Sequence, residues 1–270
     1  MRLLLAVALS VAFGSSAGAY QQVITETGEV VAWPTPNVSF AIDDSLPPGW
    51  DKQAVEDEVL ASKVVWEELE CSPLTLEFAG WTSEGTADLF DKQNHLMWVQ
   101  DDWQFGGALM AITLLEFSKF TGELRDADIL VNNNQKTFDV GVVCDGDGFN
   151  YDLRNILTHE FGHFVGLNHS DDVRATMFAD AFEGDCAKRD LNPDDIDGFC
   201  ATYEGMEPAT PDTGTGDASS EGTTVEGAPP TSDGCASKGT PNHPWLPLGI
   251  LGFVFMASRR SRQTQAPSSH

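Results

Sequence analysis

The sequence predicts an α+β domain, and the order of its apolar patterns is the reason for this fold class. Short strand-like runs occur early in the chain around one long helical pattern, and a second helical pattern follows near residue 153. The regular apolar pattern ends near residue 203. A segment of this length fits a single domain of ordinary size.

The first predicted strands are Val30–Trp33 and Val38–Ile42, which are rich in branched and aromatic residues. Pro34 and Pro36 limit the region between them, because proline cannot donate a hydrogen bond to a sheet ladder. These two runs are therefore expected to be separate strands at the start of the domain.

A helix is expected from Lys52 to Glu70, with Asp51 as its N-terminal cap. Its apolar residues recur at helical spacing with acidic residues between them, at Val55, Val59, Trp66 and Leu69. Three further strand-like runs follow, at Leu74–Phe78, Leu96–Val99 and Gly107–Leu114. The next helix is expected to open near Asp152 and to run from Leu153 to Val165.

This second helix carries the pattern His-Glu-x-x-His-x-x-Gly-x-x-His. Residues four apart lie on one face of a helix, so His159 and His163 can direct two imidazole nitrogens at a single ion. Gly166 can adopt the left-handed conformation that ends a helix and turns the chain back, which would bring His169 to the same ion. A catalytic zinc site needs three protein ligands and one open position. The spacing thus predicts one zinc ion.

Glu160 stands beside the first histidine, where a carboxylate can act as general base. It would take a proton from a zinc-activated water and pass it to the leaving amine. The alternative is that the histidines are half-buried or surface residues that hold no metal. Three of only six histidines in the chain fall within this one window, which favours the metal site.

These residues resemble the metzincin metalloproteases, and Ser170, after the third histidine, resembles the matrixin type. Met177 is similar to the methionine that supports the zinc from a tight turn in that clan, although an ordinary core methionine is the alternative. The resemblance covers roughly Trp33 to Tyr203. It implies a metzincin-type catalytic domain, with a twisted, mostly parallel mixed sheet, an active-site helix and a C-terminal helix.

Three further segments take their interpretation from this resemblance. Gly122–Asn132 looks like a late strand of the sheet, and Leu191–Ile196 looks like the start of the last helix. Gly107–Leu114 resembles the sheet edge above the cleft, to which an extended substrate adds as an antiparallel strand. The alternative, that Gly107–Leu114 is plain buried core, stays open.

The function implied is a zinc-dependent endopeptidase that acts on proteins or peptides, and we expect a monomer. The alternatives are a protease of another metzincin family and a catalytically silent surface protein that uses the fold for binding. Glu160 favours an enzyme, because a binding module has no evident need for a base beside the metal. Matrixins commonly block themselves with a propeptide cysteine in a PRCGxPD motif, which this sequence lacks. His95 is the only other histidine in the domain, so a second, structural zinc is not expected.

The two ends of the chain differ from the domain at residues 20–203. Residues 1–19 join Arg2, an apolar run and small residues, which is the pattern of an export signal. Residues 204–234 are mostly Pro, Thr, Gly, Ser, Ala and acidic residues, which predicts an extended, disordered linker. Residues 235–270 contain Cys235, a short apolar stretch and a cluster of arginines.

The apolar stretch from Trp245 to Ser258 would be about 21 Å long as a helix, less than the hydrocarbon core of roughly 30 Å. With Cys235 before it and Arg259 after it, the segment resembles C-terminal surface-sorting signals of the MYXO-CTERM type. The resemblance implies that Cys235 is the processing and anchoring position; the alternative is a weak tail anchor with an incidental cysteine. We therefore expect a protein outside the cytoplasm, secreted or anchored at the cell surface or outer membrane, with membrane contact through this segment.

Export permits disulfides, and four of the five cysteines lie in the domain. Joining Cys186 to Cys200 would close a loop of about 15 residues and stabilise the fold by roughly 3 kcal/mol. We predict this pair, and Cys71 with Cys144 by elimination. Four cysteines allow about three connectivities, so the other pairings stay open. Cysteine zinc ligands are less favoured, because no CxxC pair is present.

The formal net charge of −27 argues against nucleic acid as a partner. Before the second helix, four oxygen donors at near-alternate positions resemble part of a calcium loop: Asp145, Asp147, Asn150 and Asp152. No glutamate stands at the twelfth position of that loop. A calcium ion and a polar turn that caps the helix therefore both remain open.

Overall fold

The computed structural model describes residues 18–83, 87, 91–141, 143, 148–209 and 249–257, and all structural statements below concern these residues. Most of the predicted export signal and most of the predicted linker lie outside them, as do Cys144, Asp145, Asp147 and Cys235. The predictions that rest on those positions therefore stay predictions.

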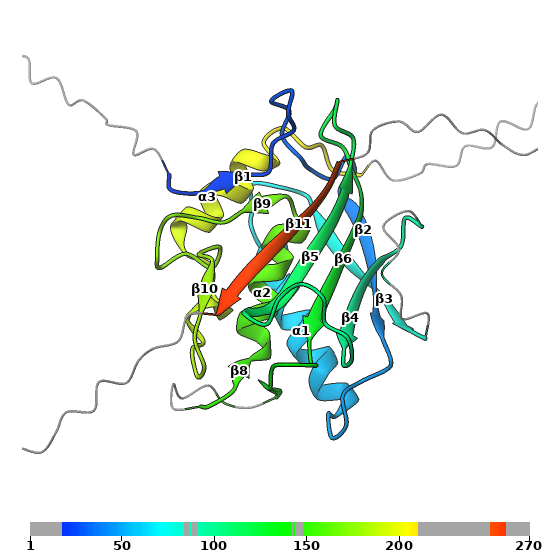
Figure 1. The fold of residues 1–270 in the computed structure, drawn as a ribbon. Helices are drawn as coiled ribbons and strands as arrows, with labels where there is room; N and C mark the ends of the chain where they lie inside the picture. Colours follow the sequence, from blue (N-terminus) through cyan, green and yellow to red (C-terminus); the bar gives the residue numbers. More distant parts are fainter. Residues whose placement is uncertain are drawn as a thin grey trace, which may run out of the picture.

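The described residues form the predicted mixture of helices and strands (Figure 1). The helices are α1 (Lys52–Glu67), α2 (Leu153–Phe164), the short 3-10 helix η1 (Ala187–Arg189) and α3 (Pro193–Thr202). The main strands are β2 (Asn37–Asp43), β3 (Thr75–Thr82), β4 (Asn94–Val99), β5 (Leu109–Phe117), β6 (Leu124–Asn132) and β11 (Gly249–Ala257). The two-residue strands are β1 (Gln21–Gln22), β7 (Phe138–Asp139), β8 (Tyr151–Asp152), β9 (Leu167–Asn168) and β10 (Asp180–Ala181).

One twisted sheet of seven strands organises the fold, in the order β10-β11-β5-β6-β4-β2-β3. The pairs β2–β3, β2–β4, β4–β6 and β10–β11 are parallel, whereas β5 runs antiparallel to both of its neighbours, β6 and β11. The predicted α+β class with a mostly parallel mixed sheet is confirmed. The exception is β5, which runs antiparallel to its neighbours and contacts α2, the helix that carries the histidine pattern.

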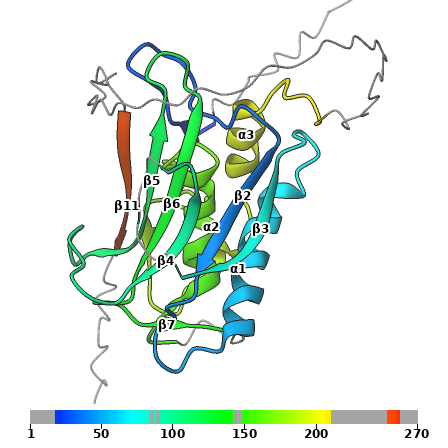
Figure 2. The ribbon, with the colours of Figure 1, turned by 90° about the vertical axis from the view of Figure 1, so that its right-hand side faces the viewer.

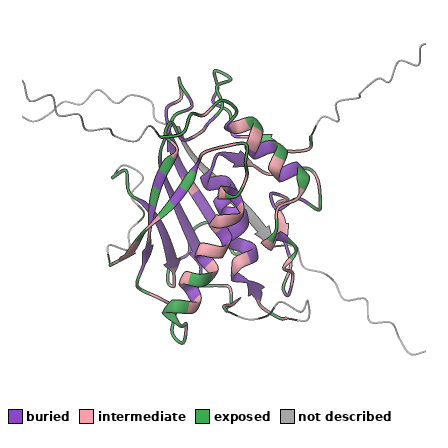
Figure 3. Ribbon diagram, turned by 180° about the vertical axis from the view of Figure 1, so that it is seen from behind, coloured by how far each residue is buried: buried purple, intermediate pink, exposed green. Residues whose placement is uncertain are grey.

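The helices α1, α2 and α3 cover the same face of the sheet, and the main core lies between these two layers (Figure 2). Strands and helix faces that meet there are buried, whereas the outer helix faces are exposed (Figure 3). Trp66 on α1 and Phe199 on α3 are both fully buried, with ring centroids 5.9 Å apart. Phe161 and Phe164 bring α2 into the same core.

The first part of the chain differs from prediction in one segment. The cap of α1 is as expected, because the Asp51 side chain accepts a hydrogen bond from the Ala54 N–H at 2.9 Å. Val30–Trp33, however, is not a strand of the sheet. The backbone hydrogen-bond partner changes from one residue to the next: the Val31 N–H donates to the Val23 carbonyl, and the Ala32 N–H donates to the Gly122 carbonyl. Only isolated β-bridges form as a result.

The predicted disulfide pairing is wrong. Cys71 is bonded to Cys200, with Cα atoms 5.5 Å apart, so neither Cys186–Cys200 nor Cys71–Cys144 forms. Cys186 belongs to another disulfide, whose second cysteine lies outside the described residues. The loop-length argument failed because Trp66 and Phe199 pack the end of α1 against α3, which brings Cys200 close to a residue 129 positions earlier.

The C-terminal apolar stretch lies partly within the described residues. Gly249–Ala257 forms β11 and pairs with β5 over most of its length. Among the helices that the structure describes, none is long and apolar enough to cross a membrane. The strand β5, predicted as either a sheet edge or plain core, therefore has a neighbour on each side.

A group of buried acids lies on the face of the sheet opposite the helices. Glu116 on β5 is paired with Asp126 on β6, and Asp128 is two residues further along. Asp126 is fully buried, and the Lys92 N–H donates to it at 2.8 Å. Burial raises the pKa of Asp126 to about 7; the Lys92 N–H opposes the shift, and neighbouring carboxylates add to it. The fold therefore favours the protonated form of Asp126.

This shift predicts a loss of stability as pH rises. An aspartate in the unfolded chain titrates near pH 3.9, so the contribution of protonated Asp126 is complete below that pH and is lost as pH rises through about 7. We expect the melting temperature to fall between pH 5.5 and pH 8, and to fall less in Asp126→Asn, which cannot titrate. Thermal unfolding of both proteins across this range measures the difference. Parallel pH profiles would show that Asp126 is not responsible.

Candidate metal centre

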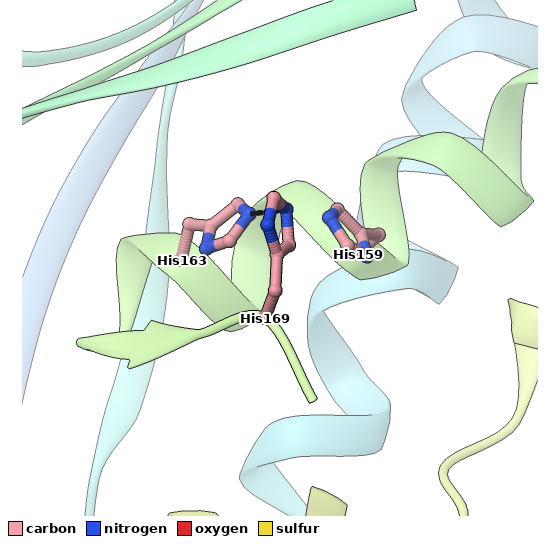
Figure 4. Close-up of side chains that lie close together, drawn as sticks. All are labelled: His159, His163 and His169. Atoms are coloured by element: carbon pink, nitrogen blue, oxygen red, sulfur yellow. Dashed lines mark hydrogen bonds between the residues drawn. The ribbon is translucent and has the colours of Figure 1, made fainter. Parts of the chain in front are cut away.

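Three histidines converge at the C-terminal half of α2, as Figure 4 shows. His159 and His163 project from one face of the helix, and His169 reaches them from the segment that follows β9. One nitrogen from each imidazole lies within 4.8 Å of the other two, and the Nε2 atoms of His163 and His169 are 3.2 Å apart. The structure thus brings together the three residues that the spacing predicted.

Backbone carbonyls orient two of these rings. The Thr176 carbonyl lies 2.6 Å from Nδ1 of His159, and the Leu167 carbonyl lies 2.8 Å from Nδ1 of His163. A carbonyl can only accept, so each Nδ1 carries the proton and leaves Nε2 as the nitrogen that can bind a metal. Burial lowers the pKa of both residues well below the usual value and that of His169 to about 4. All three imidazoles are therefore neutral at neutral pH, the form that binds a metal.

The donor set fits a zinc ion. Zinc binds imidazole nitrogen at about 2.0–2.1 Å, and two such nitrogens at tetrahedral angles are about 3.3 Å apart. The separation of 3.2 Å between His163 and His169 agrees with this value. Three neutral nitrogen donors leave one position of a tetrahedron for water or substrate.

Glu160 lies on the same helix and is fully buried beside the histidines. The Thr113 hydroxyl on β5 donates to its Oε2 at 2.6 Å, whereas Oε1 has no hydrogen-bond partner within the described part of the chain. Burial raises the pKa of Glu160 to about 8, and the Thr113 hydroxyl opposes this shift. A divalent cation nearby would also oppose it, because positive charge favours the carboxylate. Oε2 is thus held by a hydrogen bond, while Oε1 is available to accept a proton.

Gly166 ends α2 in the predicted left-handed conformation. Its φ is 90°, and its N–H bonds to the His163 carbonyl at 2.8 Å. A Cβ at this position would lie 2.2 Å from the Val31 carbonyl oxygen, which is backbone and cannot rotate away. Only glycine fits here, and the turn that it permits carries the chain toward His169.

Gly166→Ala should therefore weaken both folding and zinc binding. Left-handed strain alone costs about 1–2 kcal/mol in a residue with a Cβ, and the clash with Val31 adds to it. Gly49→Ala is the matched control, since Gly49 has a φ of 88° and open space around it. Urea unfolding and zinc titration of both variants test the comparison. Equal losses in the two would contradict a specific role for Gly166.

Met177 packs against α2 at Gly162. A Cβ on Gly162 would lie 2.1 Å from the Met177 sulfur, so glycine allows this close approach between the two histidines of the helix. The Asp195 carboxylate accepts from the N–H groups of Thr176 and Met177, at 2.7 and 2.9 Å. This α3 residue therefore fixes the turn whose Thr176 carbonyl orients His159.

Three residues of this site were not singled out from the sequence. Thr113 is a single hydroxyl in an apolar strand, and Asp195 belongs to the capping box at the start of α3. Lys188 is buried, its ammonium donates to the Phe178 carbonyl, and burial lowers its pKa to about 7. The sequence gives a local indication of two of them: Thr113 is a polar residue in an apolar run, and Asp195 lies in a helix-capping pattern. A buried Lys188 has no signal of this kind.

The calcium prediction remains untested. Asp145 and Asp147 lie outside the described residues. Asp152 caps α2 by accepting from the Asn155 N–H at 2.7 Å and also pairs with Arg189. The Asn150 side chain donates to Asp139 at 2.7 Å. These contacts explain the polar turn without deciding whether the loop binds calcium.

Comparison with known proteins places these features in a family. Residues 32–204 match the family model described as Matrixin. Human matrix metalloproteinase-27 is 46% identical over 69 residues, which are 25% of this chain and 13% of that protein. Interstitial collagenase of Equus caballus is 46% identical over 55 residues (20% of this chain, 11% of that protein), and metalloendoproteinase 1 of Glycine max is 41% identical over 58 residues (22% and 18%). The matched segments thus span less than a fifth of each relative.

Proposed function

The chain belongs to the matrixin family, and from this premise we propose that it is a zinc-dependent endopeptidase of proteins or peptides. His159, His163 and His169 would hold one catalytic zinc ion, and Glu160 would act as the general base. The observation that carries the proposal is the convergence of three neutral imidazoles within 4.8 Å of one another beside a buried glutamate. A protein that only binds peptides has no need for that glutamate.

When bound, the zinc ion supplies Lewis acidity, which polarises the peptide carbonyl and lowers the pKa of water to about 7. Glu160 accepts the proton of the attacking water and then donates it to the nitrogen of the leaving amine. Thr113 would hold Oε2 of Glu160 throughout, which leaves Oε1, without a hydrogen-bond partner among the described residues, to take the proton. The carbonyls of Thr176 and Leu167 keep the imidazoles in the tautomer that exposes Nε2.

An extended substrate would bind as a strand along β5, where backbone hydrogen bonds supply affinity and side-chain pockets supply selectivity. The geometry that supports this mode is the contact between Thr113 on β5 and Glu160. A peptide that pairs with β5 near Thr113 would bring its scissile bond close to Glu160 and the three histidines. The segment from Phe178 to Lys188, which follows Met177, would form the opposite wall.

The same proposal places the enzyme outside the cytoplasm, secreted or anchored at the cell surface. Its supports are the export pattern of residues 1–19, the disulfide Cys71–Cys200, and the C-terminal sorting pattern that begins at Cys235. A disulfide of this kind persists in oxidising compartments. Membrane contact would come through the C-terminal segment.

Metal removal and reconstitution test the proposal. The purified chain should cleave an unfolded protein substrate, lose this activity after treatment with a chelator, and regain it with one equivalent of zinc. Lys188 is buried near the centre, so activity is best measured at several pH values. Hydrolysis that persists at full rate in the metal-free chain would contradict a zinc mechanism.

A further inference from the structure

The strand β11 occupies the edge of β5 that β6 leaves open, which is the edge to which the proposed substrate strand would add. It runs antiparallel to β5, from Gly249 opposite Phe117 to Met256 opposite Leu109. It also runs parallel to β10, where Asp180 is paired with Met256. Figure 1 shows β11 in front of α2, between β5 and β10. The chain's own C-terminal segment therefore lies between the two walls proposed for substrate.

The register brings the middle of β11 to the catalytic glutamate. Phe253 is paired with Thr113, whose hydroxyl donates to Glu160 at 2.6 Å. A substrate strand that pairs with β5 would use the same backbone groups near Thr113. While β11 lies along this edge of β5, a second strand cannot lie there and pair with the same backbone groups.

We propose that Gly249–Ala257 is an autoinhibitory strand, which occupies the substrate-pairing side of β5 until the C-terminal segment is withdrawn or removed. This inference rests on the proposed function, because it needs β5 to be the substrate strand. It supplies a form of control in a chain whose sequence has no PRCGxPD motif.

Tethering makes such competition effective. The 46 residues from 203 to 248 connect the end of α3 to β11, and most of them belong to the segment whose composition predicts a linker. A linker of that kind would hold β11 near β5 at an effective concentration of the order of millimolar. Each substrate molecule therefore has to compete with a strand that is always present.

The sequence also indicates how the strand would be withdrawn. The apolar stretch that contains β11 ends at Arg259 and follows Cys235, in the arrangement that resembles a surface-sorting signal. One segment cannot pair with β5 and also contact a membrane or be cut away. Anchoring or processing at the cell surface would therefore open the cleft, and the enzyme would become active where it is displayed.

The test weakens the pairing within the full chain. In the double variant Phe253→Pro/Val254→Pro, two adjacent backbone N–H groups are lost, so one that faces β5 is removed whichever way the strand alternates. Thr223→Pro/Thr224→Pro, in the predicted linker, is the matched control. If the wild-type cleft is open in about one molecule in ten, KM for a peptide should fall about tenfold in the β11 variant, with kcat unchanged. The control variant should behave as wild type.

Hydrogen exchange supplies a second measurement that does not need activity. The amides of Leu109–Phe117 that face β11 should exchange faster in the β11 variant than in the wild type or the control. Unchanged KM and unchanged exchange would overturn the autoinhibitory strand while leaving the protease proposal intact. Faster exchange in a protein that cleaves no peptide in any variant would instead refute the proposed function, and the inhibitory role with it.

Discussion

Glu160→Gln should reduce kcat/KM for peptide hydrolysis by about 10²–10⁴-fold, the usual contribution of a positioned general base. Glutamine has the same shape and can still accept the hydrogen bond of Thr113, but its amide cannot take a proton from water. The zinc content should stay at one ion per chain, because the three histidines are unchanged. Steady-state kinetics with metal analysis of the same samples measures both quantities.

The matched control is Glu116→Gln. Glu116 is also a buried glutamate, but it lies on the face of the sheet opposite the helices and pairs with Arg125 at 3.5 Å. This variant should retain hydrolysis close to that of the wild type. Equal losses in the two variants would mean that Glu160 acts through the stability of the fold and not through proton transfer.

Replacing Cys71 and Cys200 with serine should produce the largest loss of stability that we expect. The bond joins residues 129 positions apart, and a loop of this length corresponds to about 5 kcal/mol in the chain-entropy model. In a domain of this size the melting temperature should fall by on the order of 10 °C. The physical reason is that the bond closes a loop that contains α2 and the sheet strands β3, β4, β5, β6 and β10. Differential scanning calorimetry measures the shift.

The two single variants provide the control. Cys71→Ser and Cys200→Ser each break the same bond, so each should cost nearly as much as the double variant. If each single variant instead loses little stability, and the two losses add in the double variant, then the disulfide contributes little. The two side chains would then affect stability independently.

Local patterns in the sequence were enough to predict the helices and the histidine cluster. The spacing of Val55, Val59 and Trp66 defines a buried helix face, and all three are buried in α1. His159 and His163 lie one helical turn apart, so their convergence follows from helix geometry. Gly166 was predictable as the turn, because few residues adopt a positive φ.

Contacts between distant segments could not be predicted in the same way. The pairing of Cys71 with Cys200 depends on the packing of α1 against α3, which no local pattern encodes. Val30–Trp33 has the composition of a strand, but its neighbours in space change at each residue. The pairing of β11 with β5 joins segments on either side of a long linker. Lys188 is a lysine, a residue type that is usually exposed, and its sequence neighbours give no sign that it is buried.

The central claim is that His159, His163, His169 and Glu160 form a working peptidase site. Its most direct test is to incubate the zinc-loaded chain with a broad peptide library and to identify new peptide ends by mass spectrometry. We predict cleavage at internal peptide bonds that disappears both in Glu160→Gln and in the metal-free protein. A chain that binds one zinc ion per molecule, keeps its fold and cleaves no peptide in the library would contradict the claim.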